Sequence, residues 1–318
     1  PMSSAPRTAE TGGAEAVLRR LEWTVLRRLD GLLQGDYRTL FRGTGLDLAD
    51  LREYQHDDDV RYIDWNVTAR LQTPYVREYT EARELAAWML LDLSGSVDFG
   101  SDRVTKQSVA RDFTAVLARL LARHGNRVGA ILYGAEIEAV MPARGGRLQV
   151  LQILHRIATR PPPPRSTGTD LRALLGAAHE VMARRSLVFV VSDFLSAPGW
   201  AQPLAQLAQR HEVVAVRLTD PLERALPDLG LLVMQDAETG EQLFVDTHDR
   251  AFRRRFEQVA RRRESALREA FAEAGVDVLE LSTDDDLVDA ILRFADLRKR
   301  RSRLAAAGGL PAHLARVR

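Results

Sequence analysis

The sequence contains no cysteine. This absence excludes disulfide bonds, zinc sites built from thiolates and enzymes that use a cysteine nucleophile. A chain without disulfide bonds is compatible with the reducing conditions of the cytosol.

Long apolar segments are also missing. No apolar run approaches the ~18 residues of a membrane-spanning helix, and the first residues lack the apolar core of a signal peptide. We therefore expect no membrane span and a cytoplasmic location.

Neither sign of charge is in excess. The chain has 45 Lys and Arg residues against 44 Asp and Glu residues, a formal net charge of +1. A chain with this balance lacks the overall excess of positive charge that attracts a polyanion, so nucleic acid is not an expected partner. The phosphate-binding loop of nucleotide hydrolases, the His-Glu-x-x-His zinc motif and the Gly-x-Ser-x-Gly nucleophile turn are absent too, and we expect no enzymatic activity.

The clearest positive signal is an apolar run that stops at polar residues. Residues 86–91 have the composition of a strand buried on both faces, and Asp92, Ser94 and Ser96 follow it at once. In an open parallel sheet, ligands bind outside the carboxyl ends of the strands. One carboxylate and two hydroxyl groups from a single turn are hard ligands that suit Mg²⁺ or Mn²⁺.

Two later stretches offer further oxygen ligands. A second apolar strand ends at Ser192 and Asp193, and a loop with Thr167 and Thr169 enters a helix. If the two strands are neighbours, Asp92 and Asp193 meet over one site. Each residue alone could be an ordinary turn or helix-capping residue, but the set in this order at strand ends favours a cation site.

The order of apolar patterns predicts an α/β fold with a doubly wound, mainly parallel sheet. Strands and helices alternate along the chain, and a hairpin interrupts them. The predicted strands are 86–91, 127–133, 136–141, 187–191, 213–218 and 276–281, and the predicted helices are 14–33, 105–123, 148–158, 170–184, 200–209, 248–274 and 284–294.

The site residues resemble the metal-ion-dependent adhesion site of von Willebrand factor A domains. The resemblance lies in Asp92-Leu93-Ser94-Gly95-Ser96 together with Thr169 and Asp193. It implies that these five polar residues hold a divalent cation, directly or through water. Thr169 is preferred to Thr167 because the following helix starts at the spacing seen in those domains, and Thr167 stays an alternative.

The chain as a whole resembles a bacterial family called domain of unknown function fifty-eight. The resemblance is carried by collinear motifs: Arg52-Glu53-Tyr54, Ile63-Asp64-Trp65, Lys106, Arg127-Val128-Gly129, Ser192-Asp193-Phe194, Asp220-Pro221 and Glu238-Thr239-Gly240. Members are associated with MoxR-type AAA+ ATPases. The resemblance therefore implies an adaptor or co-chaperone that acts with such an ATPase on an unknown client protein.

These observations predict a domain division. We expect a disordered tail at 1–13, an N-terminal helix and charged region packed on the core at 14–84, a von Willebrand factor A-like domain at 85–297 with a hairpin insertion at 220–246, and a basic tail at 298–318.

Three functions are compatible with the sequence. The first is a non-enzymatic protein-interaction module that binds a partner carboxylate through a divalent cation. The second is a Mg²⁺-dependent hydrolase that uses the same ligands. The third is nucleic-acid binding by the Arg-rich helix at 248–274, although its interspersed glutamates favour a solvated helix face.

Overall fold

The computed structural model describes residues 8–32, 50–55, 72–78, 86–100, 104–161, 168–235 and 242–306, with a few single positions between 63 and 69. The alternative ligand Thr167 lies outside these ranges.

A six-stranded sheet forms the centre of the molecule, in the order β10-β7-β6-β3-β4-β5. All its strands are parallel except β5, which pairs antiparallel with β4. The strands are β3 (Ala86–Asp92), β4 (Arg127–Tyr133), β5 (Ile137–Arg144), β6 (Leu187–Ser192), β7 (Glu212–Thr219) and β10 (Asp277–Ser282). The predicted doubly wound fold of the von Willebrand factor A type is confirmed.

The chain begins the sheet at β3, adds β4 and β5 on one side, and then returns to add β6, β7 and β10 on the other. The strand order therefore reverses beside β3. At such a reversal the loops after two neighbouring strands diverge to opposite faces of the sheet and leave a crevice between them. The loops after β3 and β6 border this crevice.

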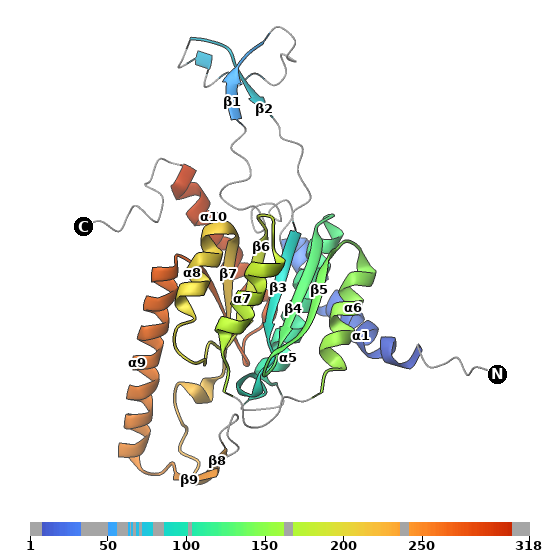
Figure 1. Cartoon of the computed structure of the whole chain (residues 1–318). Helices are drawn as coiled ribbons and strands as arrows, with labels where there is room; N and C mark the ends of the chain where they lie inside the picture. Colours follow the sequence, from blue (N-terminus) through green and yellow to red (C-terminus); the bar gives the residue numbers. More distant parts are fainter. Residues whose placement is uncertain are drawn as a thin grey trace, which may run out of the picture.

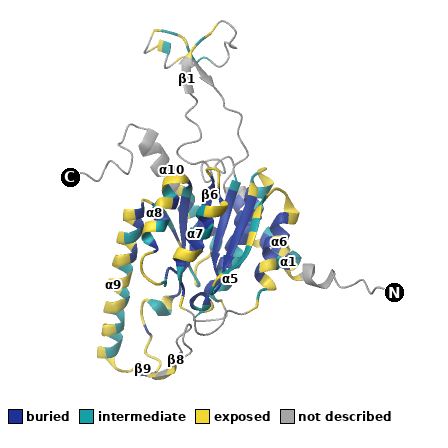
Figure 2. Cartoon of the chain, viewed as in Figure 1, coloured by how far each residue is buried: buried dark blue, intermediate teal, exposed yellow. Residues whose placement is uncertain are grey.

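Helices cover both faces of the sheet (Figure 1). One face packs on α1 (Thr8–Leu21), α5 (Lys106–Arg123), α6 (Arg147–Ala158) and α10 (Leu287–Ala306). The other packs on α7 (Leu171–Val181), α8 (Ala201–Arg210) and α9 (Arg250–Ala274). Strands β3, β4, β6 and β7 are almost entirely buried, and α9 presents a largely exposed outer side (Figure 2).

Alternation along the strands separates two hydrophobic cores. In β3, Met89 and Leu91 join the core under α5, whereas Trp88 and Leu90 join the core under α7. Side chains in a strand point to opposite faces in turn, which explains the division. Gly129 is the direct partner of Trp88 in β4, and a Cβ there would lie 2.7 Å from the indole ring. The indole therefore requires glycine at this position.

Two smaller pairs of strands accompany the central sheet. The strands β1 (Asp50–Glu53) and β2 (Tyr75–Glu78) pair with each other and lie apart from the sheet in Figure 1. The predicted hairpin consists of β8 (Leu231–Gln235) and β9 (Gln242–Asp246), which form an antiparallel pair after the short helix η4 (Pro221–Glu223).

Both terminal helices are longer than predicted. The first begins at Thr8 rather than residue 14, continues as a π-helical turn, η1 (Glu22–Leu26), and ends with α2 (Arg27–Leu32). Glycines at 12 and 13 cost about 1 kcal/mol each relative to alanine, but they keep their amide hydrogens and need not end a helix. The last helix reaches Ala306, into the predicted basic tail, because its Arg, Lys, Leu and Ala residues all favour helix.

A buried histidine lies at the start of β7. His211 is 4% exposed, and neither ring nitrogen has a hydrogen-bond partner among the described residues. Burial lowers its pKa, and the nearby side chains of Arg210, His179 and Arg185 lower it further. Folding thus holds this imidazole neutral.

This histidine should make the fold sensitive to acid. When folding lowers the pKa of a histidine, protons bind more readily to the unfolded chain. The free energy of unfolding is therefore unaffected above the unfolded pKa, about 6.5 for histidine, and decreases as the pH falls below 6.5. We expect the free energy of unfolding to drop between pH 7.5 and 5.5, and to drop less in His211→Leu. Urea unfolding at both pH values measures this, with exposed His124→Leu as the control. An unchanged pH dependence in His211→Leu would show that this residue is not responsible.

Candidate functional site

The predicted cation site begins where β3 ends. The backbone N–H of Ser94 donates to Oδ1 of Asp92 at 3.0 Å, which closes the turn after the strand. A short 3₁₀ helix, η3 (Gly95–Val97), follows and places the Ser94 and Ser96 hydroxyl oxygens 3.2 Å apart. Asp92 is fully buried and both serines are buried. Three oxygen-bearing side chains therefore converge beneath the surface.

The end of β6 completes the site from the neighbouring strand. The Ser192 hydroxyl donates to Oδ2 of Asp92 at 2.6 Å, and the N–H of Leu195 donates to Oδ1 of Asp193 at 2.9 Å. Between them Phe194 has a left-handed backbone (φ 58°) that turns the chain sharply away from the sheet. The structure thus brings Asp92 and Asp193 to adjacent strand ends, where the sequence predicted that they meet.

Thr169 lies on a loop that is fastened to the same edge. Its carbonyl accepts the N–H of Ala197 at 2.8 Å, in the loop after β6. The next residue, Asp170, donates its N–H to the hydroxyl of Tyr133 at the end of β4. Strands β4 and β6 flank β3, so the loop is held on both sides of it. Thr169 is buried, at 3% exposed.

A lysine shares the site. Lys106 is the first residue of α5, and its Nζ lies 2.7 Å from Oδ2 of Asp193 and 2.6 Å from Oε1 of Glu223. Its side chain is 1% exposed. From the sequence alone, no role follows for Lys106 and Glu223 beyond the family resemblance, because a single lysine at a helix start has no periodic or spacing signal. Only the packing of α5 under β6 and η4 reveals the contact.

Negative charge is concentrated here. Burial, and to a lesser extent the nearby charge of Asp193, raise the pKa of Asp92 to about 6, although the hydrogen bonds from Ser192 and Ser94 oppose this rise. Burial alone would lower the pKa of Lys106, but the carboxylates of Asp193 and Glu223 outweigh it and the pKa is raised. The lysine therefore stays charged and offsets part of the acidic charge.

The donor set fits an oxygen-ligated cation. Mg²⁺ takes six oxygens at about 2.1 Å in an octahedron, which puts adjacent ligands roughly 3 Å apart. The Ser94 and Ser96 hydroxyls have this spacing. Each carboxylate oxygen of Asp92 and Asp193 already accepts one hydrogen bond but keeps a second lone pair. Within the described ranges no group of three or more His, Cys, Asp and Glu side chains could hold a metal ion, so this hydroxyl-rich set is the candidate.

Comparison with known proteins shows a matching family and several sequence relatives. The family described as "Protein of unknown function DUF58" matches residues 50–266. A protein of Mycobacterium tuberculosis (strain ATCC 25618 / H37Rv), described as uncharacterized, is 38% identical over 287 residues, 90% of this chain and 90% of that protein. Another, described as an uncharacterized protein in the moxR 3′ region of Paracoccus denitrificans, is 34% identical over 105 residues, 33% of this chain and 99% of that protein.

Among solved structures, the chain is similar to an aerotolerance-related membrane protein from Bacteroides fragilis. The TM-score is 0.46 with 13% identity, over 68% of this chain and 99% of that one. At this identity the likeness concerns the fold alone.

The predicted cytoplasmic location has to be corrected. The similar solved structure from Bacteroides fragilis is described as that of a membrane protein, and the cytoplasmic prediction is withdrawn. Across the described ranges, no helix of this chain combines the length and apolarity that crossing a membrane requires. We assign no location.

The buried lysine should be essential for stability. Lys106→Met removes the ammonium group and leaves the Asp193 carboxylate without its counter-charge, which should cost about 3–5 kcal/mol of unfolding free energy. Adding Asp193→Asn to the same chain should recover part of the loss, because a neutral amide needs no counter-charge. Urea unfolding of the two single variants and the double variant measures the coupling, and strictly additive losses would show that the two groups do not interact.

Proposed function

The chain belongs to the DUF58 family of proteins of unknown function, and from this premise we propose that it is a non-enzymatic protein-interaction module that binds a partner carboxylate through Mg²⁺ or Mn²⁺. The proposed cation ligands, direct or through water, are Asp92, Ser94, Ser96, Thr169 and Asp193.

The observation that carries the proposal is the spacing of the Ser94 and Ser96 hydroxyls beside two buried carboxylates. The residues of the chain hold these oxygens in place. Ser192 and the Ser94 amide fix both oxygens of Asp92, and Lys106 with the Leu195 amide fixes both oxygens of Asp193. A bound cation would supply open coordination positions for a carboxylate from outside. Few side chains then have to move when a partner binds.

For the partner, we propose a MoxR-type AAA+ ATPase, for which this chain acts as adaptor or co-chaperone toward a client protein. The support is the relative described as lying in the moxR 3′ region of Paracoccus denitrificans. Neighbouring genes often encode proteins that act together, which makes this ATPase the first partner to test.

The hydrolase alternative uses the same ligands and predicts turnover. It needs a nucleophile and a proton donor beside the cation. The buried ammonium of Lys106 is engaged by two carboxylates, which leaves it poorly placed to transfer a proton to a substrate. Flat hydrolysis of phosphate esters with saturating Mg²⁺ would support the binding module, and metal-dependent turnover lost in Ser94→Ala would support the hydrolase.

Cation binding should stabilise the fold. A site filled well above its Kd adds roughly 1–3 kcal/mol to the free energy of unfolding. We expect millimolar Mg²⁺ or Mn²⁺ to raise the Tm of the wild type relative to EDTA and to leave Ser94→Ala unchanged, with Ser265→Ala on the exposed side of α9 as the control. In Lys106→Met the shift should be larger than in wild type, because the lysine no longer competes for Asp193. Equal shifts in wild type and Ser94→Ala would place the cation elsewhere.

Partner capture should depend on the cation. We expect the full chain to retain the MoxR-type ATPase in a pull-down with Mg²⁺, and to lose it in EDTA or with Ser94→Ala. Ser94→Ala is preferable to a change at Asp193, because the latter also removes the counter-charge of Lys106. Capture that persists in EDTA and in Ser94→Ala would reject the cation bridge.

A further inference from the structure

A basic hollow opens directly beside the candidate cation site. It has a volume of about 190 Å³ and lies between the ends of β6 and β7 and helix α9. Its lining includes five arginines and three carboxylates, among them Arg217, Arg261, Arg263, Glu264 and Asp193, together with Thr219. Asp193 belongs to the hollow and to the cation site alike.

The carboxylates of the hollow are already engaged. Asp193 and Glu223 contact Lys106, and Glu264 contacts Arg217 at 2.7 Å and Arg268 at 3.0 Å. Two of the arginines have weak ion pairs or none. Arg261 comes only within 3.8 Å of Glu257, and within the described ranges Arg263 has no ion pair. The hollow therefore has positive charge to offer.

Two buried polar atoms of the lining also lack partners. Within the part of the chain that the structure describes, the Thr219 hydroxyl and Nε of Arg217 make no hydrogen bond, although Thr219 is 3% exposed and Arg217 8% exposed. A buried donor without a partner costs about 1–3 kcal/mol. An acceptor that enters the hollow would remove this cost, so these atoms indicate a ligand with oxygen acceptors.

The size of the hollow limits that ligand. Sites for cofactors and drug-sized molecules usually measure about 300–1,000 Å³, so this hollow suits one acidic group rather than a nucleotide. We propose that it binds a second carboxylate of an acidic protein segment whose first carboxylate reaches the cation. This inference rests on the proposed function. It adds that the recognised segment carries at least two acidic side chains.

The position of the hollow supports a protein segment over a free anion. Arg261 and Arg263 are exposed on α9, whereas Thr219 and Arg217 are buried, so the lining leads from the surface to the edge of the cation site. An extended acidic chain can follow such a path. Arginine also suits it, because its planar fork binds carboxylates through two hydrogen bonds.

The test uses the full chain and a fluorescein-labelled octa-glutamate peptide. Fluorescence anisotropy is measured in EDTA at 0.15 M salt, with octa-glutamine as the neutral probe and inorganic phosphate as competitor. We expect the wild type to bind octa-glutamate and not octa-glutamine. Arg261→Gln with Arg263→Gln should weaken binding about tenfold or more, since each lost contact is a charge-assisted hydrogen bond.

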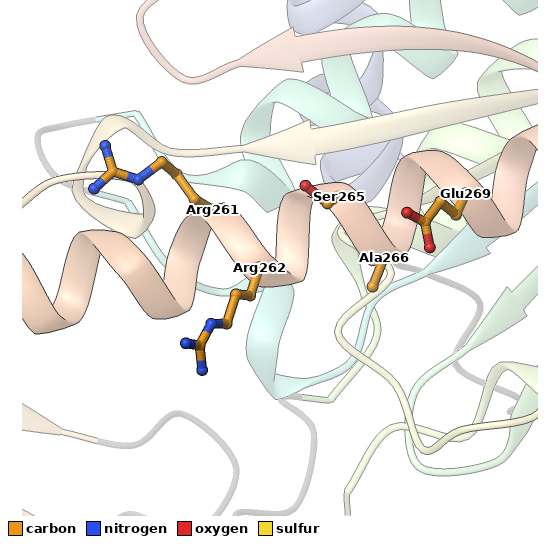
Figure 3. A pocket seen from close by; sticks show the side chains of 5 residues that line it. All are labelled: Arg261, Arg262, Ser265, Ala266 and Glu269. Carbon is orange, nitrogen blue, oxygen red and sulfur yellow. The ribbon is translucent and has the colours of Figure 1, made fainter.

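Helix α9 provides a matched control. Arg261 and Arg262 point to different sides of the helix, and both border a second, shallow hollow with Ser265, Ala266 and Glu269 (Figure 3). Only Arg261 also lines the basic hollow, whereas Arg262 does not. Arg255 lies seven residues before Arg262 and so on the same side. Arg255→Gln with Arg262→Gln removes the same charge from the same helix and should change the affinity less than twofold. Equal weakening by both double variants would overturn the proposal, as would phosphate binding without peptide binding.

Thr219→Val separates binding from folding. The unpartnered hydroxyl contributes nothing to the fold, so the Tm should stay the same or rise, while octa-glutamate affinity should fall about two- to tenfold. A lower Tm with unchanged affinity would overturn the role of Thr219.

The EDTA condition keeps this proposal distinguishable from the proposed function. Peptide binding that depends on Arg261 and Arg263 but not on Ser94 would confirm the hollow even if the cation bridge failed. Cation-dependent ATPase capture that is indifferent to Arg261 and Arg263 would reject the hollow alone.

Discussion

The buried contact between Lys106 and Asp193 is the interaction on which the carboxyl edge of the sheet depends. It places an ammonium group and a carboxylate, each 1% exposed, 2.7 Å apart. Two ions taken out of water are costly unless each has a close partner and further hydrogen bonds. Both conditions are met here, since Glu223 accepts a second contact from the ammonium group of Lys106 and the Leu195 amide donates a hydrogen bond to the carboxylate of Asp193. The contact joins α5, β6 and η4 and fixes the geometry of the edge.

This arrangement differs from a site built of acidic residues alone. Asp92 and Asp193 lie together below the surface, and their mutual repulsion would oppose folding without a positive charge nearby. Lys106 provides that charge permanently from within the chain. An external cation would then be needed for recognition rather than for folding, so the fold need not depend on the metal that the proposed function uses.

The same edge continues into the arginine-lined hollow on α9, where Asp193 and Glu223 are shared. Helix α9 is rich in both arginine and glutamate, and most of its length is a solvated face with pairs such as Arg268 and Glu264. Next to the sheet, however, α9 carries more arginines than acidic side chains that pair with them. A composition that is neutral overall thus contains a local positive surface, which net charge could not have revealed.

The sequence by itself determined the alternation of strands and helices and the polar residues at the strand ends, because both are local patterns with a fixed period. Strand β4 was predicted with its observed limits, whereas the end of the last helix was missed since helix formers continue past the predicted boundary at Phe294. Only the tertiary structure decided that β3 and β6 are neighbours, that Ser192 holds Asp92, and that Lys106 and the α9 arginines reach the site. The hydrogen bonds of Lys106 with Asp193 and Glu223, and of Ser192 with Asp92, join residues 87 to 117 positions apart. No local pattern encodes which of many polar side chains will meet across that separation.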